Sequence, residues 1–126
     1  MSEKTRILLI DDEETITRTV QLYLEATGRY EVQTENDSRN ALDTALEFRP
    51  HLAVLDIVMP EIDGGEVVAQ LQRQPELDGI RIIFLTALVK DAEVGRKGKN
   101  VGGHPFMAKP VEPASLIQLI DKTVGG

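Results

Sequence analysis

Short apolar runs, each stopped by a polar residue, constrain the fold of this chain more than any other feature. Residues 6–10 (RILLI), 52–55 (LAVL) and 81–85 (RIIFL) are almost continuously apolar. A strand of this composition is buried on both faces, which is typical of a parallel sheet covered by helices on both sides. Residues 30–34 alternate in polarity and predict an edge strand, and residues 106–108 predict a short last strand.

Amphipathic stretches separate these runs. Apolar residues recur at helical spacing over residues 13–26, 38–46, 65–73 and 113–124. The apolar stripe of the first stretch carries Ile16, Val20, Tyr23 and Leu24. The second stretch is predicted to be capped by Ser38. In the third, the side chains predicted to face inward are Val67, Val68 and Leu71.

A weaker helix is expected after Thr86, because four glycines fall within residues 95–103 and each glycine inside a helix costs ~1 kcal/mol. That segment is either a surface loop or a mobile segment that ligand binding orders.

Strands that alternate with helices imply parallel pairing through right-handed crossovers. We therefore predict an α/β fold in which a doubly wound, five-stranded parallel sheet forms the middle layer of a three-layer sandwich. The length of 126 residues fits one domain over residues 1–126, with no attached output domain.

The amino-acid composition excludes several classes of function and binding partner. The chain has no cysteine, which excludes disulfides and thiolate sites, and its net charge of −7 argues against nucleic-acid binding. No apolar run approaches the ~20 residues of a membrane span, so we expect no membrane partner and a cytoplasmic location. The sequence contains neither of the two glycine-rich nucleotide-binding motifs, G-x-G-x-x-G and G-x-x-x-x-G-K, so no residue is assigned to binding a nucleotide cofactor. His51 and His104 lack a convincing set of further ligands and are predicted to be surface or turn residues.

Polar residues end four of the predicted strands. If the five-stranded sheet has the order 2-1-3-4-5, the carboxyl ends of these strands lie at one edge, and the residues that follow them are expected to share one shallow pocket. Asp11 and Asp12 follow the first strand, Asp56 the third, Thr86 with its neighbour Ala87 the fourth, and Lys109 with its neighbour Pro110 the fifth.

Crowded carboxylates repel one another unless a cation lies among them, and carboxylate oxygens suit Mg²⁺. A metal ion and Lys109 on opposite sides of Asp56 would form a clamp for a transferring phosphoryl group, with Asp56 as the nucleophile. Taken alone, an aspartate after a strand is more often a turn former or helix cap. The combination of the three aspartates with Thr86 and Lys109 favours the phosphoryl-transfer interpretation.

The motifs that carry these residues resemble the receiver domain of bacterial two-component response regulators. Residues 7–14 (ILLIDDEE) look like the first strand and acidic pair of that family, and residues 55–64 (LDIVMPEIDG) look like its phosphoacceptor motif. Residues 85–87 (LTA) and 106–110 (FMAKP) match the last two motifs in order and spacing. The resemblance covers essentially the whole chain and implies the flavodoxin-like variant of the predicted fold.

The resemblance implies a stand-alone signalling receiver that promotes its own phosphorylation, as opposed to an enzyme that turns over external substrates. Asp56 would accept phosphate from a sensor histidine kinase or a histidine phosphotransfer protein. Asp56, Asp12 and the backbone carbonyl of Val58 would bind Mg²⁺ or Mn²⁺, with Asp11 binding directly or through water. A downstream protein would read the phosphorylated state, and the receiver would be a monomer or weak dimer.

The remaining site residues follow from the same resemblance. Lys109 would pair with the phosphoryl group, and the Thr86 hydroxyl with the N–H groups of Val58 and Ala87 would hold its oxygens. Phe106 lies at the position of a switch aromatic that moves together with Thr86, although a plain core role fits it equally. The peptide bond between Lys109 and Pro110 is a candidate for the cis form.

Two positions depart from the commonest pattern of the family. Val58 and Leu88 are both apolar. In similar proteins the side chains at these two positions influence how water reaches the phosphoryl group, so we predict a long-lived aspartyl phosphate.

Two other functions compete with the receiver interpretation. A haloacid dehalogenase-type phosphohydrolase would need a second aspartate at the position of Val58, and a receiver-like protein that has lost phosphorylation would only bind partners.

Overall fold

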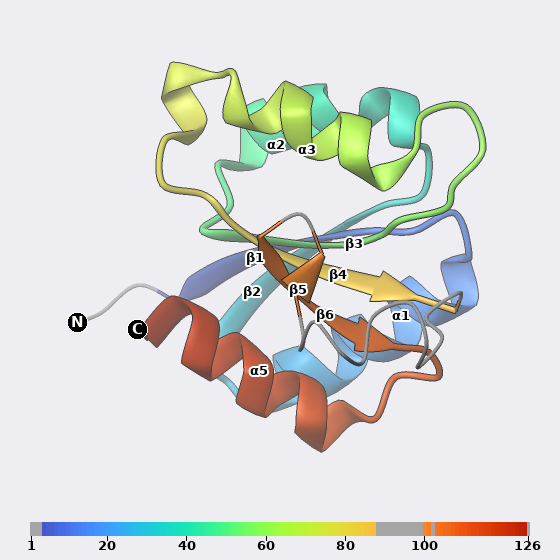
Figure 1. The fold of residues 1–126 in the computed structure, drawn as a ribbon. Coiled ribbons are helices and arrows are strands. Elements are labelled where there is room, and N and C mark those ends of the chain that lie inside the picture. Colours follow the sequence, from blue (N-terminus) through green and yellow to red (C-terminus); the bar gives the residue numbers. More distant parts are fainter. Residues whose placement is uncertain (1–3, 88–99, 102, 126) are drawn as a thin grey trace.

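The computed structural model describes residues 4–87, 100–101 and 103–125. Helices and strands alternate over residues 5–86, with two 3₁₀ helices, η1 and η2, among them, and two further strands and a last helix follow (Figure 1). In order they are β1 (Thr5–Ile10), α1 (Glu14–Ala26), β2 (Tyr30–Glu35), η1 (Ser38–Asn40), α2 (Ala41–Phe48), β3 (Leu52–Asp56), α3 (Gly64–Gln72), η2 (Pro75–Leu77), β4 (Arg81–Thr86), β5 (Asn100–Val101), β6 (His104–Ala108) and α5 (Pro113–Gly125).

The sheet has the order β2-β1-β3-β4-β6-β5, in which the first five strands are parallel. With β6 as the predicted fifth strand, the order 2-1-3-4-5 is confirmed. The two-residue strand β5 was not predicted; it pairs antiparallel with β6 and extends the sheet at that edge. The predicted fourth helix and most of the glycine-rich segment lie outside the described residues.

Two hydrophobic clusters lie on opposite faces of the sheet. Alternate residues of β1, β3 and β4 pack beneath α2 and α3 on one face, and the intervening residues pack against α1 and α5 on the other. Figure 1 shows these two helical layers above and below the sheet. Because β1, β3 and β4 are covered on both faces, their sequences are apolar throughout.

Two sequence predictions about helices were wrong. Tyr23 lies on the apolar stripe of α1 but is 51% exposed, and Thr17 is the buried residue of that helix alongside Val20 and Leu24. Ser38 does not cap α2: Asp37 instead caps η1 by accepting a bond from the Arg39 N–H. The Ser38 hydroxyl is buried and bonds to a neighbouring loop.

A polar contact ties the start of β2 to α5. The buried Tyr30 hydroxyl donates to Asp121, and Arg29 pairs with the same carboxylate at 3.1 Å. Burial, and then the bond to Asp121, raise the pKa of Tyr30 to about 12 from its ordinary value of 10.0. The folded protein therefore holds the hydroxyl proton more tightly than the unfolded chain. This contribution to stability is complete below pH 10.0 and is lost as the pH rises toward about 12.

Tyr30→Phe is expected to lower the free energy of unfolding by about 1–2 kcal/mol below pH 10.0 and to flatten its decline at higher pH. Urea unfolding across this pH range measures both effects. Tyr23→Phe is the matched control, because Tyr23 is exposed and the change should have little effect. An undiminished alkaline decline in Tyr30→Phe would contradict the assignment.

Candidate functional site

The predicted site residues gather at the edge of the sheet where β1, β3, β4 and β6 end. Asp56 is the last residue of β3 and pairs in register with Leu85 of β4. Thr86 ends β4, and its carbonyl accepts a bond from the Lys109 N–H at 2.9 Å. Asp11 follows β1 directly, so parallel pairing brings these residues together from distant parts of the sequence.

Three carboxylates at this edge form a possible metal site. Asp11, Asp12 and Asp56 each offer an oxygen atom, and these atoms lie within 4.8 Å of one another. Asp11 and Asp56 are buried, whereas Asp12 is exposed. An all-oxygen set with one open side fits Mg²⁺ or Mn²⁺, which prefer carboxylates and retain several water ligands.

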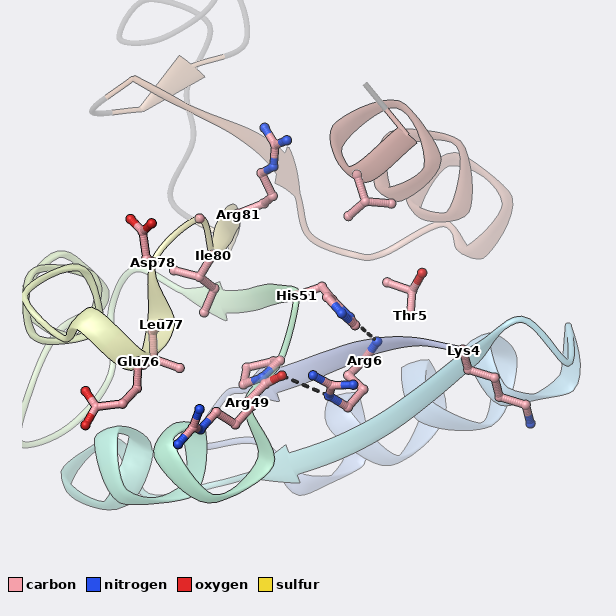
Figure 2. A pocket seen from close by; sticks show the side chains of 13 residues that line it. Lys4, Thr5, Arg6, Arg49, His51, Glu76, Leu77, Asp78, Ile80 and Arg81 are labelled. Carbon is pink, nitrogen blue, oxygen red and sulfur yellow. Dashed lines mark hydrogen bonds between the residues drawn. The ribbon is translucent and has the colours of Figure 1, made fainter. Parts of the chain in front are cut away.

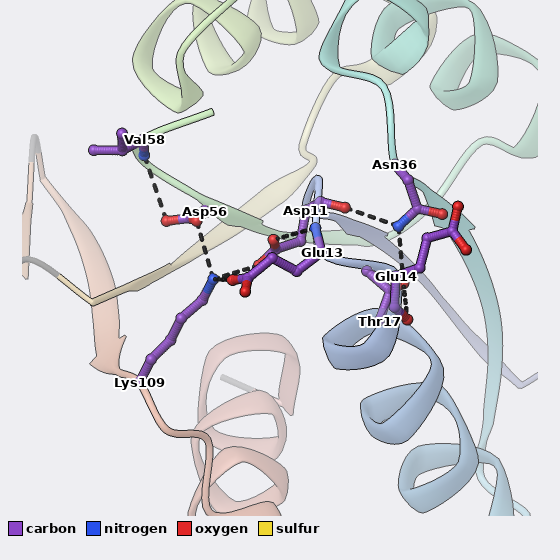
Figure 3. A network of polar contacts seen from close by, with 8 residues as sticks. All are labelled: Asp11, Glu13, Glu14, Thr17, Asn36, Asp56, Val58 and Lys109. Carbon is purple, nitrogen blue, oxygen red and sulfur yellow. Dashed lines mark hydrogen bonds and ion pairs between the residues drawn. The ribbon is translucent and has the colours of Figure 1, made fainter. Parts of the chain in front are cut away.

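The Lys109 ammonium lies among the carboxylates (Figure 3). Its Nζ is 2.7 Å from Asp11 Oδ2, 3.0 Å from Asp56 Oδ2 and 3.1 Å from Glu13 Oε1. The Lys109 side chain is only 8% exposed, so this charge is held in place and largely shielded from solvent. It partly neutralises the cluster and lies beside the predicted phosphoacceptor.

Burial shapes the protonation of this cluster. Burial raises the pKa of Asp11 above its ordinary value, and the hydrogen bond from Lys109 opposes that shift. For Lys109, burial alone would lower the pKa, but the hydrogen bonds to Asp11 and Asp56 outweigh it and raise the pKa. Lys109 therefore remains charged at neutral pH, which its predicted role of pairing with a phosphoryl group requires.

The loop between β3 and α3 surrounds the other side of Asp56. The Val58 N–H lies 3.4 Å from Asp56 Oδ1 and points toward it, while the Val58 side chain is 54% exposed. Gly64 donates its N–H to the carbonyl of Ile57 at 2.7 Å. A Cβ on Gly64 would overlap the backbone carbonyl of Asp56, so α3 can pack this close to the strand end only through a glycine.

The remaining predicted residues lie around this centre. Thr86 is buried and Ala87 is exposed. Phe106 is partly buried and packs against the cluster beneath α2 and α3, a position that suits a core residue and a switch equally. The peptide bond between Lys109 and Pro110 is cis, as the resemblance implied. Leu88 lies outside the described residues.

Two contacts of the site were not predicted from the sequence. Glu13 pairs with Lys109, and the Asn36 amide bonds to the backbone of Asp11 and to Thr17 (Figure 3). Glu13 adjoins the acidic pair, so proximity in sequence could have indicated it. Asn36 comes from the loop after β2, and only the folded arrangement brings it here.

The two histidines lie away from these carboxylates. His51 lines a cavity of about 570 Å³ formed by residues 4–6, 49–51, 76–81 and 124, and its Nδ1 accepts the Arg6 backbone N–H at 2.9 Å (Figure 2). His51 is exposed, as predicted. His104 is not a loop residue: it begins β6, and its ring meets Phe84 edge-on at 6.0 Å.

Comparisons with known proteins agree with this geometry. The family model described as the response regulator receiver domain matches residues 7–121. The alkaline phosphatase synthesis transcriptional regulatory protein PhoP of Bacillus subtilis is 40% identical over 112 residues, 88% of this chain and 45% of PhoP. The chain spans about half the length of the first curated relatives it matches. Protein PilH of Pseudomonas aeruginosa is 30% identical over 122 residues, 96% of this chain and 98% of PilH.

Solved structures give the same result. The chemotaxis protein CheY4 of Vibrio cholerae has a TM-score of 0.82 and 29% identity, covering 96% of this chain and 99% of that one. The receiver domain of the Pseudomonas aeruginosa sensor histidine kinase PA1611, solved with a magnesium ion in its active-site cleft, has a TM-score of 0.80 and 25% identity, with coverages of 98% and 100%. Within the described residues of our chain, no helix is long and apolar enough to cross a membrane. The match over residues 7–121, together with the fold, shows that the chain belongs to the response regulator receiver domain family of two-component signalling.

Proposed function

We propose that this chain is a phosphorylation switch in which Asp56 accepts a phosphoryl group from a phosphohistidine donor. The donor would be a sensor histidine kinase or a histidine phosphotransfer protein. The observation that carries the proposal is the placement of a buried Asp56 carboxylate 3.0 Å from the Lys109 ammonium, beside two further aspartates. This arrangement sets a nucleophile between a fixed cation and a site suited to a second one.

In the transfer, an Asp56 oxygen forms a new bond to phosphorus while the phosphorus–nitrogen bond of phosphohistidine breaks. The released imidazole nitrogen takes up a proton. Lys109 is placed to pair with the phosphoryl oxygens, with the Thr86 hydroxyl and the backbone N–H groups of Val58 and Ala87 as further donors. Neutralising the transferred group is the main work of such a site, because phosphoryl transfer depends chiefly on positioning and electrostatics.

The acidic cluster suits a resident metal ion. Asp11, Asp12, Asp56 and the Val58 carbonyl would hold Mg²⁺ or Mn²⁺, which when bound supplies positive charge opposite Lys109. The magnesium ion in the PA1611 receiver domain supports the same ion here. The chain's own residues provide the nucleophile, the counter-charge and the oxygen ligands.

Phosphorylation would place two negative charges between Lys109 and Thr86 and bias a rearrangement of the surrounding segments. Phe106 on β6 is the side chain that we assign to this rearrangement, and a downstream protein would read the surface formed with α5. A single-domain role over residues 1–126, a cytoplasmic location and a monomeric or weakly dimeric state stay predictions. PilH, matched over 98% of its length, supports the first of these.

A small phosphoramidate donor tests the proposal without knowledge of the kinase. With Mg²⁺ present, the mass of the intact protein should increase by one phosphoryl group, and a chelator should prevent the change. Beryllofluoride with Mg²⁺ should also bind, which a receiver-like protein that has lost phosphorylation would not do. Sustained turnover of a generic phosphatase substrate would instead favour the phosphohydrolase, although Val58 occupies the position of the second acid that this class requires.

The exposed Val58 side chain leads to a prediction about the lifetime of the phosphorylated state. An apolar side chain two residues after Asp56 cannot hold or orient an attacking water molecule, so the aspartyl phosphate should persist without a phosphatase. Val58→Asn should shorten its lifetime, measured as loss of phosphoryl from the purified protein. A lifetime of seconds in the unchanged protein would contradict this prediction, and Leu22→Asn, at another exposed apolar position, is the control.

A further inference from the structure

The loop that joins β2 to α2 contacts the loop that carries Asp11 and Asp12. Asn36 Nδ2 donates to the backbone carbonyl of Asp11 at 2.8 Å and to Thr17 Oγ1 at 2.9 Å (Figure 3). The Asp11 carbonyl lies beyond the end of β1, and Thr17 is a buried residue of the first turns of α1. One amide group therefore ties Asp11, directly after the strand, to the start of the helix, and Asp12 lies in the short segment between these two points.

The same β2–α2 loop also contacts the loop that follows Asp56. Ser38 is 4% exposed; its Oγ donates to the carbonyl of Pro60 at 2.8 Å and accepts from the Ile62 N–H at 3.2 Å. Between these two contacts lies Glu61, whose φ of 73° is in the left-handed region that residues with a side chain rarely adopt. Such a conformation persists where the surroundings fix it. Here the Ile62 N–H bonds to the Pro60 carbonyl at 2.8 Å across Glu61, and the Ser38 hydroxyl contacts both of these groups.

These three loops meet beside the carboxylates. A groove of about 200 Å³ is lined by residues of all three, among them Asp12, Asn36, Ser38 and Pro60. Asp11, Asp12 and Asp56 repel one another, so loops free to move would let the carboxylates spread apart. Mg²⁺ requires near-ideal octahedral geometry, and outer residues that orient metal ligands commonly change metal affinity by 10–100-fold.

We propose that the β2–α2 loop is the positioning element of the metal site, acting through Asn36 and Ser38. Asn36 fixes the loop that carries Asp11 and Asp12, and Ser38 fixes the loop that carries the Val58 carbonyl. Neither side chain is a metal ligand. The inference rests on the proposed function in one respect, namely that Mg²⁺ is the ion that these loops position.

Titration of the purified, unphosphorylated chain with Mg²⁺ by calorimetry tests the role. Asn36→Ala and Ser38→Ala should each raise the Kd for Mg²⁺ about 10-fold. Asn40→Ala is the matched control: Asn40 is exposed in the same segment and its side chain makes no capping bond, so the Kd should stay within about twofold. The Mg²⁺ concentration that half-saturates phosphorylation by phosphoramidate should rise in parallel, while the rate at saturating Mg²⁺ stays near that of the unchanged protein.

A purely structural role gives a different result. It would lower the unfolding temperature of both variants equally with and without Mg²⁺ and leave the Kd unchanged, which would overturn the inference. Circular dichroism establishes folding, and Asn36→Gln, which displaces the same amide, replaces Asn36→Ala if that variant is unfolded. If the unchanged chain does not bind Mg²⁺, the proposed metal site itself is overturned. If the unchanged chain and both variants bind Mg²⁺ with the same Kd, only the positioning role of Asn36 and Ser38 is overturned.

Discussion

Replacing Asp56 by asparagine should abolish phosphoryl incorporation from phosphoramidate. The amide preserves the shape of the side chain but lacks an anionic oxygen that can attack phosphorus. Asp56 is buried beside Lys109 and two further carboxylates, and the Val58 N–H points toward its other oxygen, so donors lie on both sides of the carboxylate that would carry the phosphoryl group. Intact-mass spectrometry after reaction with the donor and Mg²⁺ measures the effect directly.

Asp43→Asn is the control for this experiment. Asp43 is an exposed aspartate on α2, and its replacement should leave incorporation unchanged. Incorporation that persists in Asp56→Asn would show that another residue accepts the phosphoryl group. Peptide mapping of the modified protein would then identify it.

Replacing Lys109 by methionine should greatly lower the free energy of unfolding. Lys109→Met removes the ammonium that lies 2.7 Å from Asp11 and 3.0 Å from Asp56, and leaves both buried carboxylates without their counter-charge. Removing one partner of a buried ion pair typically costs about 3–5 kcal/mol. Urea unfolding in the absence of metal should show a loss of this size, a large part of the roughly 5–15 kcal/mol that stabilises a domain.

Added Mg²⁺ should restore part of the stability of Lys109→Met, because the ion supplies positive charge to the same carboxylates. Lys122→Met is the matched control: Lys122 is an exposed lysine in the last turn of α5, and losing it should cost less than about 1 kcal/mol. A loss of equal size in the two variants would mean that the charge cluster contributes little to the fold.

Much of this architecture could be predicted from local sequence pattern. The runs before Asp11 and Asp56 are apolar at every position because β1 and β3 are covered on both faces, so their burial, and the polar residue that ends each, are visible in the sequence. The strand order leaves no such local signal; the order 2-1-3-4-5 entered as a condition on the parallel sheet and is confirmed by the structure. Residues at strand ends converge by topology alone, which is why the central carboxylates and Lys109 could be assigned from the amino-acid sequence.

Contacts that depend on the path of a loop were not predictable in this way. Ser38 suits a helix cap by residue type, but Asp37 caps η1 and the Ser38 hydroxyl reaches Pro60 across the sheet edge. Tyr23 satisfies the helical period of α1, yet its side chain stays exposed. The pairing of β5 with β6 involves only two residues, too few to leave a periodic signal.

Gly64 illustrates a different kind of constraint on an active site. It offers no functional group, yet the space that a methyl group would need is occupied by the backbone of Asp56 and, at 2.9 Å, by the Cα of Ile57. Mutational tolerance at this position is therefore set by the end of β3 rather than by any property of α3. A residue can thus be indispensable to the chemistry through the volume it leaves empty, and a search for reactive side chains alone would pass over it.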